Sequence, residues 1–389
     1  MNPRIRFPVL LILIFYGLNS AVRSQSPSLN LSGYLQNLNT LWIKDVTSQW
    51  YSMSSVVNRL NLKLYLSNQW TVNAAARNAL TYGQLIYLNH PYYADLLVGD
   101  EGRLNLTTVI RRDSSYIFYS HLDRLNLHFV QDRFELTLGR QRINWGINLV
   151  WNPNDLFNTF NFYDFDYAER PGCDALRLQY FTGYASSWQA AVKINRENQL
   201  TAALLYKFNY RNYDLQLLAG VMDEDGVIGA GWSGYLSDAG FSGEVSYFRN
   251  YKHIADSSGV LVLSMAVNYT FSNSLFAHVA ILYNSAGTTG KAGWGDSFLT
   301  MQDLSPKTFT PARYALFGQM TYPLSPLIRA DFSTVFNPND HSLFLGPGLD
   351  FSISDNITFL LLGQIFRGKT GTEFGDYGTL IYTRLKWSF

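Results

Sequence analysis

The C-terminal segment, residues 379–389, constrains the fold more than any other stretch, because its apolar and polar residues alternate strictly. Ile381, Leu385 and Trp387 fall on one side of an extended chain, and Arg384 and Lys386 fall on the other. A period of two produces two distinct faces only in a β-strand. The segment is therefore predicted to be a strand with an apolar face that ends in aromatic residues and a cationic opposite face.

The N-terminus predicts the compartment. Arg4 and Arg6 precede a short apolar run at residues 7–18, and small residues follow near position 24. This order is typical of a secretory signal peptide, predicted over residues 1–24. No later stretch approaches the roughly 20 apolar residues that a helical membrane span needs. If the chain crosses a membrane it must do so as a closed β-barrel, because only helices and closed barrels satisfy their backbone polar groups in lipid.

Composition agrees with one non-helical domain over residues 25–389. Aromatic residues reach 16% while charged residues are only 15%, and no linker or low-complexity tract divides the chain. Loss of the three arginines of the predicted signal peptide would change the formal charge from +1 to −2, which gives no reason to expect a nucleic-acid partner. The single cysteine, Cys173, excludes an internal disulfide.

About 18 strand-like segments follow one another from residues 29–38 to residues 379–389, and an even number is expected of a single-chain bacterial barrel. Their connections alternate between tight turns rich in Asn, Asp, Ser and Pro and much longer loops. The predicted fold is an all-β, transmembrane, antiparallel up-and-down β-barrel. The long loops are predicted at residues 39–58, 78–115, 144–173, 284–311 and 367–378, with a short helix or an extra strand near residues 104–110.

If the apolar phase of each strand faces lipid, the other phase faces the lumen. The cations predicted to line the pore are Arg59, Lys63, Arg133, Arg177, Lys193, Lys207, Arg313, Arg329 and Arg384. Acidic residues on this phase are fewer, so the wall is expected to attract anions. The alternative is that these charges only solvate the wall and pair across strands.

The loop at residues 144–173 is predicted to fold into the lumen and to constrict it, because long loops with their own side-chain packing are usually functional. The residues assigned to this constriction are Arg140, Arg142, Trp145, Trp151, Asp155, Asp166, Glu169 and Arg170. Arg140 or Arg142 is expected to pair with Asp155, Asp166 or Glu169. Six aromatic residues could stack on sugar rings: Trp145, Trp151, Phe157, Phe160, Phe162 and Tyr163. The alternative is a surface loop held by salt bridges.

Three stretches of this region carry a family resemblance. They read Gly-Arg-Gln-Arg-Ile-Asn-Trp-Gly at 139–146, Trp-Asn-Pro-Asn-Asp at 151–155 and Glu-Arg-Pro-Gly at 169–172. Together they resemble the outer-membrane porin-like barrels of the alginate-export and related families. The resemblance is local to residues 139–177. It implies 18 antiparallel strands and transport of an anionic or sugar solute through a basic lumen.

Chemical motifs argue against an enzyme. The six histidines show no metal-ligand spacing, and no nucleophile elbow or phosphate-binding loop is present, so no cofactor is expected. The favoured function is a channel of the outer membrane for passive passage of small anionic or saccharide solutes. The expected partners are outer-membrane lipid, lipopolysaccharide and the barrel-assembly machinery, which would read the terminal Phe389. The alternatives are a barrel that anchors or exports a capsule-like polysaccharide with little conductance, and a barrel enzyme acting on lipid.

Overall fold

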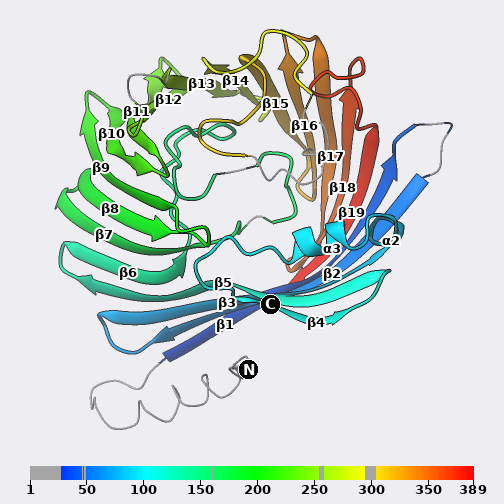
Figure 1. Ribbon diagram of the computed structural model, residues 1–389, viewed down its shortest axis with the longest axis horizontal. Helices are drawn as coiled ribbons and strands as arrows, with labels where there is room; N and C mark the ends of the chain where they lie inside the picture. Colours follow the sequence, from blue (N-terminus) through cyan, green and yellow to red (C-terminus); the bar gives the residue numbers. More distant parts are fainter. Residues whose placement is uncertain are drawn as a thin grey trace.

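A computed structural model describes residues 28–45, 47, 50–159, 161–167, 169–253, 258–293 and 304–389. The predicted signal peptide, residues 1–24, lies outside these ranges. The described chain forms one antiparallel sheet of nineteen strands, eighteen of which close into a barrel (Figure 1). No helix in the described part is long and apolar enough to cross a bilayer.

The strands follow the chain in order around the barrel, with β4 outside the ring of eighteen. Their bounds are β1 Ser28–Ile43, β2 Trp50–Tyr65, β3 Trp70–Gly83, β4 Thr107–Arg112, β5 Tyr116–Gln131, β6 Phe134–Gln141, β7 Cys173–Gly183, β8 Ser186–Ile194, β9 Leu200–Tyr210, β10 Tyr213–Met222, β11 Asp225–Leu236, β12 Ala239–Asn250, β13 Val260–Thr270, β14 Phe276–Asn284, β15 Tyr314–Ser325, β16 Ile328–Asn337, β17 Ser342–Ser354, β18 Ile357–Arg367 and β19 Thr379–Ser388.

The first and last strands close the ring. β1 pairs with β19 from Tyr34 opposite Ser388 to Ile43 opposite Thr379. Phe389 continues this closure, because its backbone exchanges two hydrogen bonds with Gly33, at 2.9 and 3.0 Å. Closure gives each of the eighteen strands of the ring two hydrogen-bonded neighbours, so the ring has no free edge that lipid would leave unsatisfied.

The barrel is apolar outside, whereas its inner face carries buried polar side chains beside an apolar cluster that packs against the inward loop. Leu138, Leu217 and Ile228 are more than half exposed on the outer face, whereas Gln36 and Gln216 are buried on the inner face. Aromatic side chains gather outside at both rims, with Trp188 stacked on Tyr206 near the short turns and Tyr283 beside Tyr314 near the long loops. An apolar outer band between two aromatic girdles is what a bilayer requires.

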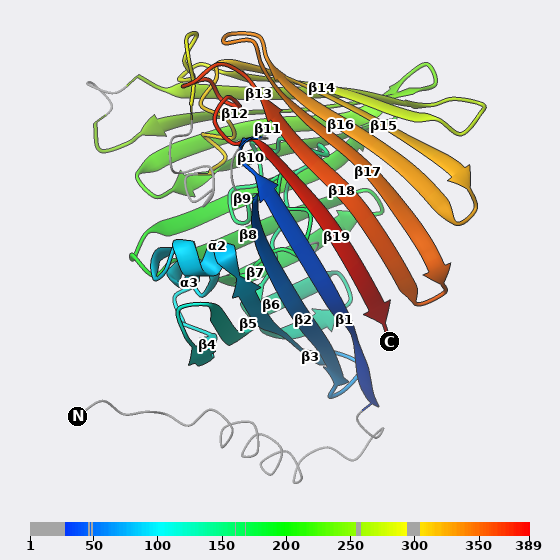
Figure 2. The same ribbon diagram turned by 90° about the vertical axis from the view of Figure 1, so that its right-hand side faces the viewer.

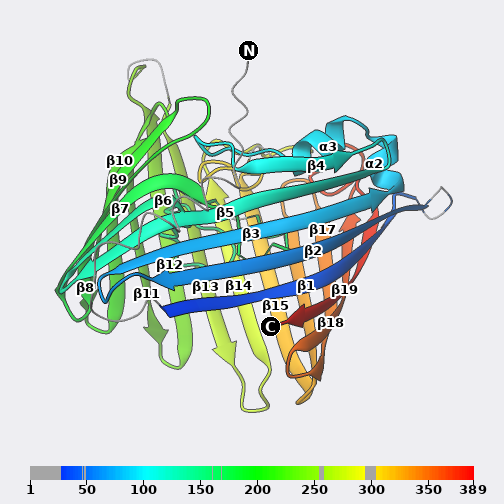
Figure 3. The same ribbon diagram turned by 90° about the horizontal axis from the view of Figure 1, so that it is seen from below.

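All of the long loops lie at one end of the barrel, as predicted, although the β10–β11 connection at that end is only residues 223–224, so the barrel has a short-turn end and a long-loop end (Figures 2 and 3). One predicted long loop was wrong: β1 and β2 extend further than expected, which leaves only residues 44–49 between them. The predicted 78–115 loop begins later, after β3 ends at Gly83. It holds α2 Gln84–Leu88, α3 Tyr92–Leu97 and the extra strand β4.

The extra strand β4 pairs with the part of β5 that the shorter strand β6 leaves unpaired. β5 pairs along one side with β3, and on its other side it pairs with β6 only over Leu125–Gln131. Beyond the end of β6, the same side of β5 pairs with β4. Close by, α3 packs its buried Ala94 against Val57 and Ile117, which point into the lumen. The long-loop half of the lumen is therefore partly filled by this segment.

Candidate functional site

A loop of residues 142–172 crosses the interior of the barrel. β6 ends at Gln141 and β7 begins at Cys173, and these two residues are register partners on adjacent strands. A tight turn could join them, but the chain instead runs through the ring of strands, as Figure 1 shows. The predicted inward loop is present and touches several parts of the wall.

A buried carboxylate of the wall anchors the first half of the loop. Glu244 of β12 is fully buried, and its oxygens accept backbone hydrogen bonds from Asn148 at 3.0 Å and Asn154 at 2.9 Å, and a further one from Ile147. Backbone N–H groups that point to one carboxylate hold the loop without any charged partner side chain.

The loop's aromatic residues are packing anchors. The Trp145 indole donates to Gln189 at 3.0 Å, and its carbonyl accepts from Gln216 at 3.0 Å. Trp145, Trp151 and Phe157 are each at most 6% exposed. The prediction that these three stack on sugar rings was therefore wrong, because their faces are already covered by protein. Phe160 lies outside the described residues.

The middle of the loop packs on the wall of β15, β17 and β18. Phe162 contacts Phe317 edge to face, with ring centroids 4.9 Å apart, and Tyr163 contacts Phe344 at 5.1 Å. Gln364 of β18 donates to the Tyr163 carbonyl at 2.9 Å. Burial raises the pKa of the Tyr163 phenol well above its ordinary value. Phe162 and Tyr163, like the tryptophans, serve packing.

The end of the loop carries acids to a basic stretch of wall. Asp166 accepts from Gln36 at 2.9 Å and lies 3.5 Å from Arg77 and 3.9 Å from Arg384. Glu169 accepts from Tyr34 at 3.2 Å and lies 3.9 Å from Arg59. These two predicted acids thus lie near cations of β2, β3 and β19 and accept hydrogen bonds from neutral side chains of β1.

Two residues of the wall form a buried ion pair close to these contacts. Arg59 of β2 donates two hydrogen bonds to Asp123 of β5, at 2.5 and 3.0 Å, and both side chains are at most 2% exposed. Tyr167 of the loop donates to the same carboxylate at 2.5 Å. Arg59, predicted to line an open pore, is instead neutralised within the wall.

Three further arginines lie close together where the loop enters and leaves the wall. Arg124 donates to the carbonyls of Glu169 and Arg170, at 2.5 and 3.0 Å. The Nε of Arg142 is buried without a hydrogen-bond partner among the described residues. Burial, and next the neighbouring Arg142, lower the pKa of Arg170 to about 10. Arg124, Arg142 and Arg170, called here the arginine cluster, make the surroundings of the loop positive.

Asp155 faces the same region. Its side chain is 1% exposed, and one oxygen accepts from the Trp145 backbone at 3.3 Å. Burial raises the pKa of Asp155 to about 7, and the nearby Glu244 adds to the effect, while Arg142 and Arg170 oppose it. The carboxyl therefore sits near the arginine cluster but titrates close to neutrality.

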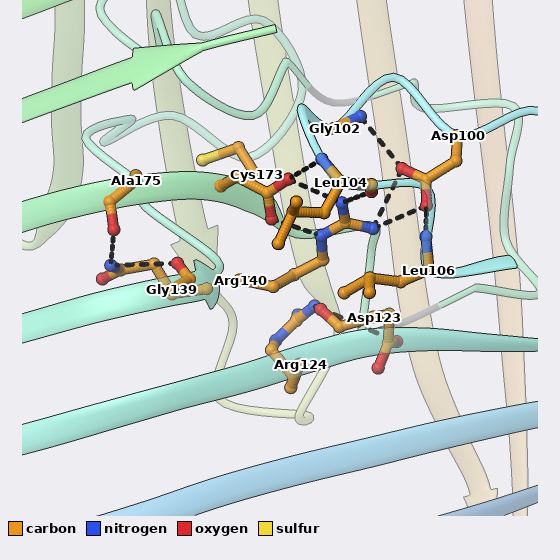
Figure 4. Close-up of polar contacts among 12 residues, drawn as sticks. Asp100, Gly102, Leu104, Leu106, Asp123, Arg124, Gly139, Arg140, Cys173 and Ala175 are labelled. Atoms are coloured by element: carbon orange, nitrogen blue, oxygen red, sulfur yellow. Dashed lines mark hydrogen bonds and ion pairs between the residues drawn. The ribbon is translucent and has the colours of Figure 1, made fainter. Parts of the chain in front are cut away.

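Arg140 has partners that sequence reasoning did not predict (Figure 4). Its guanidinium donates to Asp174 at 2.7 and 2.8 Å, to Asp100 at 2.8 and 2.9 Å, and to the carbonyl of Leu104 at 2.6 Å. Arg140 thus ties the segment before β4 to β6 and β7. Its expected pairing with Asp155, Asp166 or Glu169 was wrong, because Asp100 approaches from a distant part of the chain.

The remaining predicted cations are spread along the wall. Lys193 donates to the Phe157 carbonyl at 2.8 Å and so supports the loop. Arg329 pairs with Asp331 of its own strand β16 and with Asp350 of the neighbouring strand β17, and Arg313 donates to the Gly287 carbonyl outside the strands. The others lie on inward positions of β2, β7 and β9 or in the β5–β6 turn, namely Lys63, Arg177, Lys207 and Arg133.

The sequence held one signal for the missed residue Asp123. Leu122-Asp123-Arg124-Leu125 interrupts the alternation of β5, and the pairing with β3 shifts register there, between Ala75 and Ala76. Such a bulge adds a residue and re-aims side chains. Asp123 therefore points inward and meets Arg59. Glu244 carried no comparable signal, because its role depends on the path of the loop.

These features define a class: a transmembrane, porin-like β-barrel of eighteen strands with an inward loop. No family model matches the chain, and no curated protein matches it. Solved structures match across nearly the full length. OccAB4 of Acinetobacter baumannii is 9% identical, with a TM-score of 0.59 over 94% of this chain and 99% of its own.

Two structures from Pseudomonas aeruginosa are similar to a comparable degree. OccK5 (OpdH) is 11% identical, with a TM-score of 0.58 over 95% of this chain and 99% of its own. OpdK, solved with vanillate, is 11% identical, with a TM-score of 0.56 over 92% and 98%. These similarities bear out the eighteen-stranded fold and the porin-like part of the sequence resemblance, but do not support its alginate-export part.

Proposed function

We propose that this chain is an outer-membrane channel through which small anionic solutes pass down their concentration gradient. The observation that carries the proposal is the position of the arginine cluster. The loop brings Arg142 and Arg170 to the wall residue Arg124. The nearby acids Asp123, Asp166 and Glu169 lie close to other wall arginines, namely Arg59, Arg77 and Arg384, and Asp123 is also 3.9 Å from Arg124. The surplus is positive, and a positive constriction concentrates anions.

Saccharide solutes receive less support than anions. The aromatic residues that could have stacked on sugar rings are covered by protein. The alternative of a polysaccharide barrel with little conductance is favoured by one observation, the packing of α3 on lumen-facing Val57 and Ile117. In either case, Phe389 at the barrel seam is proposed to be the residue that the assembly machinery reads.

The reversal potential in a KCl gradient across a planar bilayer tests the proposal. We expect the wild-type channel to prefer chloride, and Arg142→Glu to shift the reversal potential toward the potassium value. Arg133→Glu is the matched control, because Arg133 is exposed in the β5–β6 turn. A cation-selective wild type, or equal shifts in both variants, would refute an anion filter at the arginine cluster. Absence of openings would favour the polysaccharide alternative.

A further inference from the structure

A cavity lies in the lumen, away from the arginine cluster. It has a volume of about 490 Å³ and lies between Ile147 of the loop and the inner wall of β7–β11. Its lining includes Phe181, Ser187, Lys207, Asp214, Gln216 and Ser233. The volume falls within the range of small-molecule sites. The arginine cluster lies on β5 and beside the end of β6 and the start of β7, whereas the cavity lies beside the β7–β8 turn, so the two regions lie on different parts of the wall.

Strand register explains why a hollow forms here. Phe181, Ser187, Lys207 and Gln216 are successive partners across β7, β8, β9 and β10, so their inward side chains form one row. Gly231 continues the row on β11. A Cβ at Gly231 would lie 2.7 Å from Ile147 Cδ1, so the absence of a side chain at Gly231 allows Ile147 of the loop to pack against the wall and to cover one side of the cavity.

The two charged residues of the cavity, Asp214 and Lys207, differ in their hydrogen-bond partners. Asp214 accepts from Asn209 at 2.9 Å and is exposed. Among the residues that the structure describes, no hydrogen bond or ion pair is made by the Lys207 ammonium. Glu244, the carboxylate that acts on Lys207 over a distance, already accepts the loop's backbone N–H groups. Lys207 is thus a cation that shares the cavity with Phe181 and Ile147 and makes no ion pair within the described residues, although the carboxylates Glu244 and Asp214 act on it over a longer distance.

We propose that this cavity is a second binding station for a small organic anion with a flat apolar body. The anionic group would accept from Lys207, and the body would lie against Phe181 and Ile147. Asp214 would repel the anion and so hasten its release. The proposal rests on the proposed function, because the solute would reach this station after passing the arginine cluster or before it.

Binding of 4-iodobenzoate to the full-length barrel in detergent micelles tests the station without requiring conduction. We expect Lys207→Gln to weaken binding about tenfold, since it removes a charge-assisted hydrogen bond. Asp214→Asn should tighten binding at least twofold. A purely structural disturbance would weaken binding in both variants, so opposite signs identify a site.

Lys63→Gln is the matched control. Lys63 also faces inward, but its ammonium lies over the Tyr65 ring, 4.9 Å from the centroid, so its loss should change binding less than twofold. Failure of the wild type to bind, equal affinity of Lys207→Gln and wild type, or less than twofold tightening by Asp214→Asn would overturn the proposal. The reversal potential judges the proposed function separately, and the iodine peak in a crystal of the complex would locate the ligand.

Discussion

Arg59 and Asp123 form a buried ion pair in the wall, so replacing either residue alone should destabilise the barrel. Because both side chains are almost fully buried, Asp123→Asn leaves a charge without its partner, which costs about 3–5 kcal/mol. We expect this destabilisation in the free energy of unfolding measured with urea in micelles. The double variant Arg59→Met, Asp123→Leu removes both charges, so its free energy of unfolding should fall much less. Equal losses would mean that packing, not charge pairing, sets the effect.

Asp155 makes the loop sensitive to pH. Its folded pKa of about 7 exceeds the ordinary value of 3.8, so the folded state binds a proton that the unfolded state has released. The contribution to stability is therefore present below about pH 4 and is lost as pH rises to about 7. The charged groups acting on Asp155 are Glu244, Arg142 and Arg170.

Hydrogen exchange of the loop amides, corrected for intrinsic rates, measures this dependence. Protection of the Trp145 region should fall between pH 5 and pH 8 in the wild type. Asp155→Asn should flatten the profile because the amide does not titrate. A wild-type profile that is already flat would show that the carboxyl is ionised throughout.

At the scale of elements, Arg140 joins parts that no strand ladder joins. β6 ends halfway along β5, and the segment before β4 lies next to the part of β5 that β6 does not reach. Arg140 holds this segment through hydrogen bonds to Asp100, and it also bonds Asp174 of β7. One isolated β-bridge, Gly102 to Asn195, adds a backbone contact. We expect Arg140→Gln to expose this segment to trypsin at the exposed Arg103. Lys252→Gln, which breaks an exposed ion pair with Glu224, should not. Identical digestion of both variants would show that β4 alone holds the segment.

The elements that the sequence predicted are those in which local pattern and final environment agree. β19 alternates because one face meets lipid and the other meets the lumen, and the same rule located the other seventeen strands of the ring. The rule failed at β5, where the bulge at Leu122–Arg124 changes the phase. It was also silent on Arg140, whose partner Asp100 lies forty residues away. Pairing of charges across a lumen depends on loop paths that no local period encodes.

At the scale of the whole molecule, two parts of the barrel depend on different features of the sequence. The wall depends on alternating apolar and polar residues, and the inward loop depends on hydrogen bonds to particular wall residues. The wall is apolar outside because lipid surrounds it, and its polar inner face supplies Gln189, Gln216, Glu244 and Gln364 to hold the loop. The loop reaches Arg124 at its C-terminal end and lines the cavity of Lys207 through Ile147 near its start. Selectivity would arise from the loop more than from barrel width.

Unitary conductance after excision of the loop tests the central claim most directly. Gln141 and Cys173 are register partners, so a two-residue turn can replace residues 142–172 while leaving the barrel closed. We predict small, anion-selective openings for the wild type and several-fold larger, weakly selective openings for the excised barrel. Equal conductance and selectivity in the two proteins would contradict the account, because the loop would then neither narrow nor charge the path.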